Sequence, residues 1–310
     1  MTILVTGAAG YIGSHTVVEL LAQGYRVVAL DNHCNSSGAV YERVEAIASA
    51  EFTRVVADVR DESALDRLLS THSVDTCIHF AALKAVGESG QKSLDYWDNN
   101  VGGLLTLLRA LDRVGIRRFV FSSSATVYGA PDFSPVPEGA ALRPASVYGQ
   151  TKLAGEQILQ ALTTPSSPWQ VATLRYFNPV GAHPSGLVGE APQGTPNNLM
   201  PYITQVALGQ RRELSVFGGD YPTPDGTCIR DYIHVQDLAA GHVAALRHLL
   251  DEPGSFTVNL GTGRGTSVRE LISTFERVNS VSVPSVVVGR RSGDVPEYFA
   301  DSSLANEVLG

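Results

Sequence analysis

The sequence is poor in cysteine and in positive charge, and it has no long apolar run. Its 310 residues include three cysteines, Cys34, Cys77 and Cys228, with no CxxC spacing. An odd, scattered set of this kind does not indicate a disulfide framework and is typical of a reducing compartment. A chain of this length also buries enough surface to fold without disulfides or metals.

Positive charge is outweighed by negative charge. The net charge is −8 at pH 7, which argues against nucleic acid or an anionic membrane as the main partner. No apolar run approaches the ~18 residues of a membrane-spanning helix, and MTILVTGAAG lacks the cationic start of a signal peptide. We therefore expect a cytoplasmic protein. The histidines show no HExxH or similar ligand spacing, so we expect no metal.

Short apolar runs alternate with helical patterns over the first half of the chain. The strand-like runs include ILVTG, RVVALD, FTRVVADV and DTCIHFAA, and continue to WQVATLRYFN. Continuous apolar strands are expected in a parallel sheet that is buried on both faces. The pattern predicts an α/β fold of the Rossmann type, a doubly wound parallel sheet.

The chain becomes richer in glycine, proline and turn formers after about residue 177. The segments HPSGLVGEAPQGTPNN and GGDYPTPDGT are expected to be long surface loops. We predict a first domain over 1–176 and a smaller α/β substrate domain over 177–310. Part of 230–262 is expected to return to the first domain.

The first strand is followed by a glycine triplet, Gly7, Gly10 and Gly13, that opens an apolar helix. An ordinary strand-to-helix turn can carry the same triplet. In this context, however, bare backbone N–H groups and the positive helix end favour a pyrophosphate. Asp31 ends the second strand, where a carboxylate accepts ribose hydroxyls and repels a 2′-phosphate. The residues predict an NAD site, although an N-cap or loop aspartate remains an alternative for Asp31.

The stretch SVYGQTK places Tyr148 and Lys152 four residues apart, on one face of a predicted helix. Most such pairs are ordinary surface pairs. Here Ser122, Ser123 and Ser124 end a strand, at the sheet edge where α/β folds bind ligands. A tyrosine base near neutral pH needs its pKa lowered by about 3 units, or about 4 kcal/mol. We expect the Lys152 ammonium and an oxidised nicotinamide to provide that shift, with Ser124 hydrogen-bonded to the reacting oxygen.

The serine, Tyr-x-x-x-Lys and glycine motifs together resemble the short-chain dehydrogenase/reductase superfamily in its nucleotide-sugar-modifying branch. Further segments, among them RYFNPVGAHPSG, DYPTPDGT, IRDYIHVQDLA and RRSGDVPEY, resemble the UDP-glucose 4-epimerase family along nearly the whole chain. The resemblance implies reversible interconversion of UDP-galactose and UDP-glucose through a 4-keto sugar, with NAD retained. It also implies a homodimer, with helices near 95–113 and 148–163 as candidate contacts.

Two alternatives remain open at this point. Related sugar dehydratases carry an Asp-Glu pair directly after the strand-end serine or threonine, where this chain has Ala125 and Thr126. Without an acid and base there, a 4-keto sugar is expected only to be reduced again. A non-catalytic NAD-binding sensor is the other alternative, but it would not need both Tyr148 and Lys152.

The resemblance also implies site residues beyond the motifs. Cofactor contacts are expected from Tyr11, Ile12, Asn32, His33, Cys34, Asn35, Ser36, Asp58, Val59, Phe80, Ala81, Ala82, Leu83, Lys84, Asn99, Ser122 and Phe177. Substrate contacts are expected from Lys84, Ser124, Tyr148, Asn178, Asn198, Leu199, Ser215, Val216, Phe217, Arg230, Arg291, Asp294 and Tyr298. Arg230 and Arg291 would clamp the diphosphate, and Asp294 would hold the uridine ribose. A bulky Tyr298 would narrow the sugar pocket against N-acetylated sugars.

Overall fold

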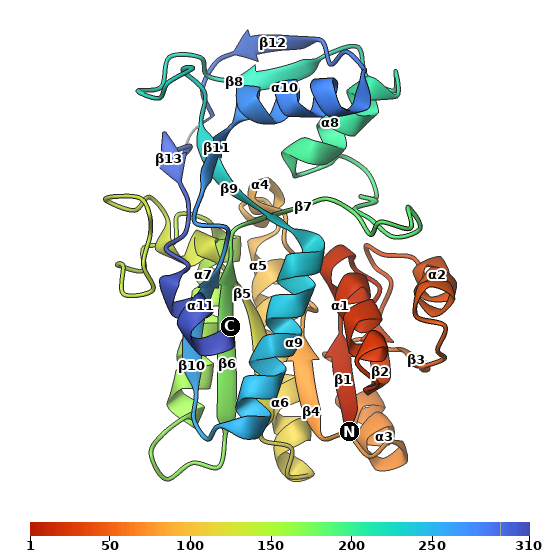
Figure 1. The fold of residues 1–310 in the computed structure, drawn as a ribbon. Coiled ribbons are helices and arrows are strands. Elements are labelled where there is room, and N and C mark those ends of the chain that lie inside the picture. The colour runs from red at the N-terminus through yellow and green to blue at the C-terminus, as the bar shows by residue number, and fades with distance from the viewer. Residues whose placement is uncertain (292) are drawn as a thin grey trace.

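The computed structural model describes residues 1–291 and 293–310. Ser292, within the RRSGDVPEY motif, lies outside the described residues. Figure 1 shows a large sheet flanked by helices in the lower part of the molecule, with smaller strands and helices above it.

Seven parallel strands form the large sheet, in the order β10-β6-β5-β4-β1-β2-β3. Their bounds are β1 (Thr2–Thr6), β2 (Arg26–Asp31), β3 (Thr53–Val56), β4 (Thr76–His79), β5 (Arg118–Ser124), β6 (Gln170–Tyr176) and β10 (Phe256–Leu260). The direction of winding reverses between β1 and β4. Ligands of doubly wound sheets bind beyond the carboxyl ends of the strands at this reversal.

Helices cover both faces of the large sheet. One face carries α1 (Tyr11–Ala22), α2 (Ala39–Ala48), α9 (Val235–Asp251) and α11 (Ser303–Leu309). The other carries α3 (Glu62–Thr71), α6 (Gly103–Arg113) and α7 (Val147–Leu162). Shorter turns are α4 (Val86–Ser89), α5 (Ser93–Trp97), the π-helix η1 (Asp98–Gly102) and the 3-10 helix η2 (Ala125–Tyr128).

Burial on both faces explains the apolar strands of the sequence. In β1, Ile3 and Val5 pack against the helices of one face, whereas Leu4 packs against the other, and all three are fully buried. Successive strand residues point to opposite faces, so a strand covered on both sides needs apolar residues at every position. The prediction of a doubly wound parallel sheet is confirmed.

The upper part of the molecule has its own small sheets and core. A four-stranded sheet contains β7 (Asn178–Val180), β9 (Ile229–His234), β11 (Gly265–Ser267) and β13 (Glu297–Tyr298), and a two-stranded sheet pairs β8 (Leu214–Phe217) with β12 (Ser285–Val288). Helices α8 (Leu199–Ala207) and α10 (Val268–Asn279) pack on the two-stranded sheet. We call this part, from β7 to β13 without α9 and β10, the upper lobe.

The chain crosses between the two parts more than once. After β9 it returns along α9, whose buried residues pack with those of α1, and β10 then pairs with β6 at the edge of the large sheet. Figure 1 shows α9 lying along the sheet next to α1. The lobes are therefore joined by several segments, which fixes the upper lobe over the carboxyl ends of the strands.

Two general properties concern the described part of the chain. No helix within residues 1–291 and 293–310 combines the length and the apolar character needed to cross a membrane. Cys34, Cys77 and Cys228 are free thiols in the same residues, with Cys34 exposed and the other two buried.

Candidate active site

A cavity of about 1380 Å³ lies at the carboxyl ends of the strands, under the upper lobe. It is lined by most of the predicted cofactor residues, namely Gly7, Gly10, Tyr11, Ile12, Gly13, Asp31, Asn32, Cys34, Asn35, Ser36, Val59, Phe80, Ala81, Ala82, Leu83, Lys84, Asn99, Tyr148 and Lys152. Its volume exceeds the ~300–1000 Å³ of a common ligand pocket.

The glycine loop is held in a shape that only glycine fits. Gly7 has a φ of +69°, and a Cβ there would lie 2.6 Å from the backbone nitrogen of Ala81. A Cβ on Gly13 would lie 2.2 Å from the carbonyl oxygen of Gly7. The loop therefore brings bare backbone against the start of α1, where a pyrophosphate binds to helix N–H groups.

Asp31 joins the glycine loop to the end of β2. Its buried carboxylate accepts hydrogen bonds from the backbone N–H of Ala9 at 3.0 Å and of His33 at 2.8 Å. The Ser36 hydroxyl donates a third hydrogen bond at 2.9 Å. Three donors hold the carboxylate in place at the cavity wall, where it retains acceptor capacity for ribose hydroxyls.

Asp58 lies behind this wall rather than in it. Its carboxylate accepts from the Asn32 amide at 2.8 Å and forms an ion pair with Arg60 at 2.8 Å. The Arg60 guanidinium holds the pKa of Asp58 well below its usual range. Asp58 thus orients Asn32, which does line the cavity.

Tyr148 and Lys152 lie on the buried face of α7, with exposed fractions of 6% and 4%. The helix begins at its N-cap Ser146, whose hydroxyl accepts from the Gly149 N–H at 3.1 Å. The Lys152 ammonium donates to the Ser122 carbonyl at 2.7 Å. It also lies 6.0 Å from the centre of the Tyr148 ring.

The expectation that the Lys152 ammonium and an oxidised nicotinamide together lower the pKa of Tyr148 stays a prediction, since it includes the cofactor. Burial raises the pKa of Tyr148 well above its ordinary value, and the nearby Ser124 side chain counteracts this only in part. Burial also lowers the pKa of Lys152 to about 8. Desolvation penalises the charged form of each side chain and is the largest cause of both shifts.

Two buried histidines near Lys152 make stability depend on pH. Burial lowers the pKa of His79 to about 3 and that of His242 to about 4. The unfolded chain binds more protons than the folded chain between these values and about 6.5, so stability is lost as the pH falls below 6.5. Between pH 7 and pH 5, each histidine should cost the fold about 2 kcal/mol.

Replacing His242 with glutamine should reduce the difference in free energy of unfolding between pH 7 and pH 5 by about 2 kcal/mol, measured by chemical denaturation at both pH values. His248→Gln on the same helix, at a position only partly buried, is the control and should keep the wild-type difference. A His242→Gln protein with an unchanged difference would contradict this account.

The upper lobe contributes a segment to the cavity wall that the sequence motifs did not identify. The lining includes Gly186, Leu187, Val188, Gly189, Glu190, Ala191, Pro192, Gln193, Thr195 and Asn197. Glu190 forms an ion pair with Lys84 at 3.6 Å and accepts from the predicted substrate residue Asn198 at 2.6 Å. The Gly- and Pro-rich composition predicted a loop there, but gave no sign of what it covers.

Other lining residues were also missed. Tyr176, at the end of β6, lines the cavity and accepts a hydrogen bond from Ser122 at 3.2 Å. Asn100 does not itself line the cavity but holds the lining segment after β4 in position, because its side chain donates to the Leu83 carbonyl and accepts from the Leu83 N–H. Their chemistry is ordinary, and the sequence gives no motif for them.

The predicted substrate residues of the upper lobe form a second group, which does not line the cavity. Asp294 pairs with Arg230 at 3.5 Å and with Arg291 at 3.0 Å. The Arg291 guanidinium lies 4.7 Å from the centre of the Phe217 ring. Both arginines are therefore paired with Asp294, and their direct contact with a diphosphate stays a prediction.

Strand β8 alternates between core and surface. Ser215 and Phe217 are exposed, whereas Val216 is buried in the core of the upper lobe. The Val216 side chain is thus turned away from any ligand on this strand, and only its backbone remains accessible to one. Leu199, the first residue of α8, also packs against this core.

Four more predicted residues lie between the lobes. Phe177 is buried, with its ring 5.2 Å from that of Tyr298, and Asn178 lies in β7 opposite Tyr232 of β9. Tyr298 donates a hydrogen bond to the Ala125 carbonyl. Ser124, one residue before Ala125, accepts from the Thr126 N–H at 3.2 Å.

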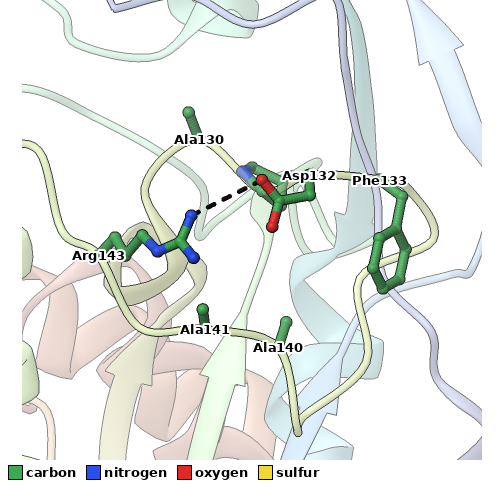
Figure 2. A pocket seen from close by; sticks show the side chains of 7 residues that line it. Ala130, Asp132, Phe133, Ala140, Ala141 and Arg143 are labelled. Atoms are coloured by element: carbon green, nitrogen blue, oxygen red, sulfur yellow. Dashed lines mark ion pairs between the residues drawn. The ribbon is translucent and has the colours of Figure 1, made fainter.

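A second cavity, of about 40 Å³, lies in the loop between η2 and α7. Figure 2 shows Asp132 and Arg143 pointing toward each other across it, and their closest charged atoms are 3.6 Å apart. The volume suits about one water molecule, so it is no nucleotide site. In the described residues no three His, Cys, Asp or Glu side chains form a group that could hold a metal.

The fold and the site together define a dinucleotide-binding enzyme of the α/β class, with a serine, a tyrosine and a lysine at the carboxyl edge of its sheet. The chain belongs to the NAD dependent epimerase/dehydratase family, whose model matches residues 3–261.

Individual relatives cover almost the whole chain. The UDP-glucose 4-epimerase of Bacillus subtilis strain 168 is 53% identical over 310 residues, which are 100% of this chain and 91% of that protein. A crystal structure of the UDP-glucose-4-epimerase of Stenotrophomonas maltophila, with bound NAD and formylated UDP-arabinopyranose, has 53% identity and a TM-score of 0.98, covering 100% and 92% of the two chains. That of the Bifidobacterium longum enzyme, in complex with NAD+ and UDP, has 48% identity and a TM-score of 0.95, with the same coverage.

Proposed function

We propose that the protein is a UDP-glucose 4-epimerase, which interconverts UDP-galactose and UDP-glucose through a 4-keto sugar. The observation that carries the proposal is the placement of Tyr148 and Lys152 in one cavity with the glycine loop and Asp31. The relatives named above act on or bind nucleotide sugars of this kind, and two were solved with the cofactor.

The residues of the cavity fit NAD. The glycine loop would bind its pyrophosphate, Asp31 its adenosine ribose, and the Lys152 ammonium its second ribose. Bound NAD+ would supply the acceptor for the hydride that leaves C4 of the sugar. Its reduced form would supply the hydride that returns. The positive charge of NAD+ would also favour the Tyr148 phenolate, which the protein's own groups do not.

Tyr148 then acts as the base that takes the O4 proton and later gives it back, while Ser124 holds the reacting oxygen. Ala125 and Thr126 provide no acid or base for elimination of water. The keto sugar therefore has only one productive fate, rotation in the site followed by reduction on one face or the other.

We further propose that the residues around Arg230, Arg291 and Asp294 bind the UDP part of the substrate. Arginine forks match phosphate oxygens, so a diphosphate would compete with Asp294 for both guanidinium groups. Ser215 and Phe217 present their side chains on the same lobe. In this proposal residues 1–176, with α9 and β10, bind the cofactor, and the rest of 177–310 binds the nucleotide sugar.

Homodimerisation through the helices near 95–113 and 148–163 is part of the proposal. Leu94 is 81% exposed and Trp97 is 37% exposed, beside the buried residues of α6. Large apolar side chains at a helix surface favour burial against a second copy. A cytoplasmic location is also proposed, in keeping with an exposed free Cys34.

The activity test uses the purified protein with UDP-galactose and no added cofactor. Because the cofactor is not consumed, UDP-glucose should form over many turnovers per protein molecule. Lys152→Met, which removes the ammonium at similar side-chain length, is the matched inactive control. If wild type formed no UDP-glucose even with added NAD, the proposed function would be wrong.

Tyr298 should restrict the sugar pocket. Its ring packs against Phe177 and its hydroxyl is tied to the Ala125 carbonyl, so it is held in place next to the strand-end serine. Tyr298→Ala should raise turnover of UDP-N-acetylglucosamine by at least about tenfold, because a bound acetamide group would gain the space of the ring. Phe133→Ala, at an exposed position, is the control. Comparable turnover of N-acetylated and plain sugars by wild type would contradict the prediction.

A further inference from the structure

A buried ion pair joins helix α7, which carries Tyr148 and Lys152, to strand β6, outside the cavity wall. Glu156 of α7 and Arg175 of β6 are 9% and 6% exposed. The guanidinium donates three hydrogen bonds to the carboxylate, from Nε at 3.0 and 3.2 Å and from Nη2 at 2.6 Å. Burying both charges is costly unless their geometry is well defined, so the pair calls for a functional explanation.

Glu156 is hydrogen-bonded to β5, the strand that ends in Ser122, Ser123 and Ser124. The Ser123 hydroxyl donates to its carboxylate, and Ser123 lies opposite Arg175 in the β5–β6 register. On one side of Ser123, the Ser122 carbonyl accepts from Lys152 at 2.7 Å. On the other side is Ser124. The ion pair therefore fixes the middle residue of the three-serine segment whose neighbours meet Lys152 and the substrate.

Glu156 also lies one helical turn beyond Lys152, on the same buried face of α7. The surroundings of the Lys152 ammonium are otherwise apolar or uncharged, with the Phe121 ring centre at 5.0 Å. The titratable groups that interact with Lys152 are Glu156 and Tyr148 of α7 and His79 of β4. Tyr176 of β6, Tyr96 of α5 and His242 of α9 lie next to Tyr148 or Ser122. Of these, Glu156 is the group whose negative charge raises the pKa of Lys152.

Arg175 is held firmly from its other side. It donates to the Tyr128 hydroxyl at 3.0 Å and to the Glu138 carbonyl at 3.0 Å. Tyr128 in turn donates to Asn259 at 2.7 Å, and Asn259 donates to the Val136 carbonyl at 2.9 Å. These contacts hold the guanidinium in place against the Glu156 carboxylate.

We propose that Glu156, paired with Arg175, is a positioning residue for the reaction: it fixes Ser123 between the two functional serines and places a carboxylate one helical turn from the Lys152 ammonium. This inference deepens the proposed function and rests on it. Loss of the negative charge would remove the group that favours the Lys152 ammonium, so the ammonium would lose its proton at lower pH. The rate would then fall on the alkaline side.

The test compares the rate of UDP-galactose conversion from pH 6.5 to pH 9 in wild type, Glu156→Gln and Glu156→Asp. For Glu156→Gln, the rate at pH 9 relative to pH 6.5 should fall about tenfold below the wild-type ratio, equivalent to a pKa change of about one unit. Glu156→Asp, which keeps the charge, should restore most of the ratio. Gln157→Glu, on the exposed side of the same helical turn, should match wild type. A Glu156→Gln profile parallel to wild type, with or without a uniform loss, would overturn the inference.

Two further experiments cover the cases in which Glu156→Gln does not fold or the wild type is inactive. If Glu156→Gln does not fold, the double variant Glu156→Gln/Arg175→Met removes both charges, and the alkaline limb of its pH–rate profile should shift in the same direction. An unshifted limb there would overturn the inference. If wild type converts no UDP-galactose, the proposed function has failed instead, and the Lys152 ammonium is titrated by lysine-selective NMR with and without Glu156→Gln. If the Lys152 ammonium titrated at the same pH in both proteins, the inference would be contradicted.

Discussion

Tyr148→Phe should reduce the rate of UDP-galactose conversion by roughly 10²- to 10⁴-fold, the range that general acid–base catalysis contributes. The substitution removes only the hydroxyl. The ring at this 6%-exposed position would continue to pack on α7. Stability should therefore change little, and NAD content should stay at the wild-type level. The measurement is the steady-state rate alongside cofactor content by release and absorbance.

The control for this prediction is Tyr128→Phe, which removes a buried hydroxyl that takes part in the network around Arg175. It should cost stability without abolishing turnover. If Tyr148→Phe kept its full rate in a folded, NAD-loaded sample, Tyr148 would not be the base.

Gly13→Ala should give a protein that no longer retains NAD. The added Cβ would lie 2.2 Å from the Gly7 carbonyl oxygen, a distance that real Cβ atoms do not adopt, so the loop or α1 must move. The backbone N–H groups at the helix start would then lose their alignment with the pyrophosphate. We expect at least about a hundredfold loss of cofactor affinity, equivalent to about 2.7 kcal/mol, measured by NAD titration.

Gly139→Ala is the matched control for Gly13→Ala, because a Cβ there meets no atom within 4 Å. It should retain NAD as wild type does. Unchanged NAD retention in Gly13→Ala would mean that the glycine loop is not the pyrophosphate site.

The fold was predictable where the signal is local. Strand β1 reads ILV because both faces of the sheet are covered, and the glycines after it are required by the backbone path. Those two facts are visible within a dozen residues of sequence. By contrast, the pairing of β10 with β6 joins segments about 80 residues apart, and no local pattern specifies it.

The site residues were likewise predictable only where a local sequence pattern marks them. Tyr148 and Lys152 were recognisable because four residues separate them on a helix, and Ser124 because it ends a strand. The 186–197 segment was not, since a loop has no period that shows which way its residues face. Nor was the engagement of Arg230 and Arg291 by Asp294, which depends on how three side chains meet in space.

The pKa of Tyr148 shows a further limit of sequence reasoning. The spacing correctly placed a lysine beside the phenol, but the balance between charge and burial depends on depth below the surface, which spacing does not give. Burial dominates in the protein alone. Reactivity of this tyrosine is thus expected to depend on a bound cation, so catalysis and cofactor retention are linked.

The most direct test of the account follows the hydrogen at C4. UDP-galactose carrying deuterium at C4 is incubated with the purified protein in ordinary water, and the UDP-glucose formed is analysed by mass spectrometry. The account predicts that the product retains the deuterium, because this hydrogen leaves and returns as a hydride inside the cavity and only the O4 proton passes through Tyr148. Replacement of the deuterium by solvent hydrogen would contradict it.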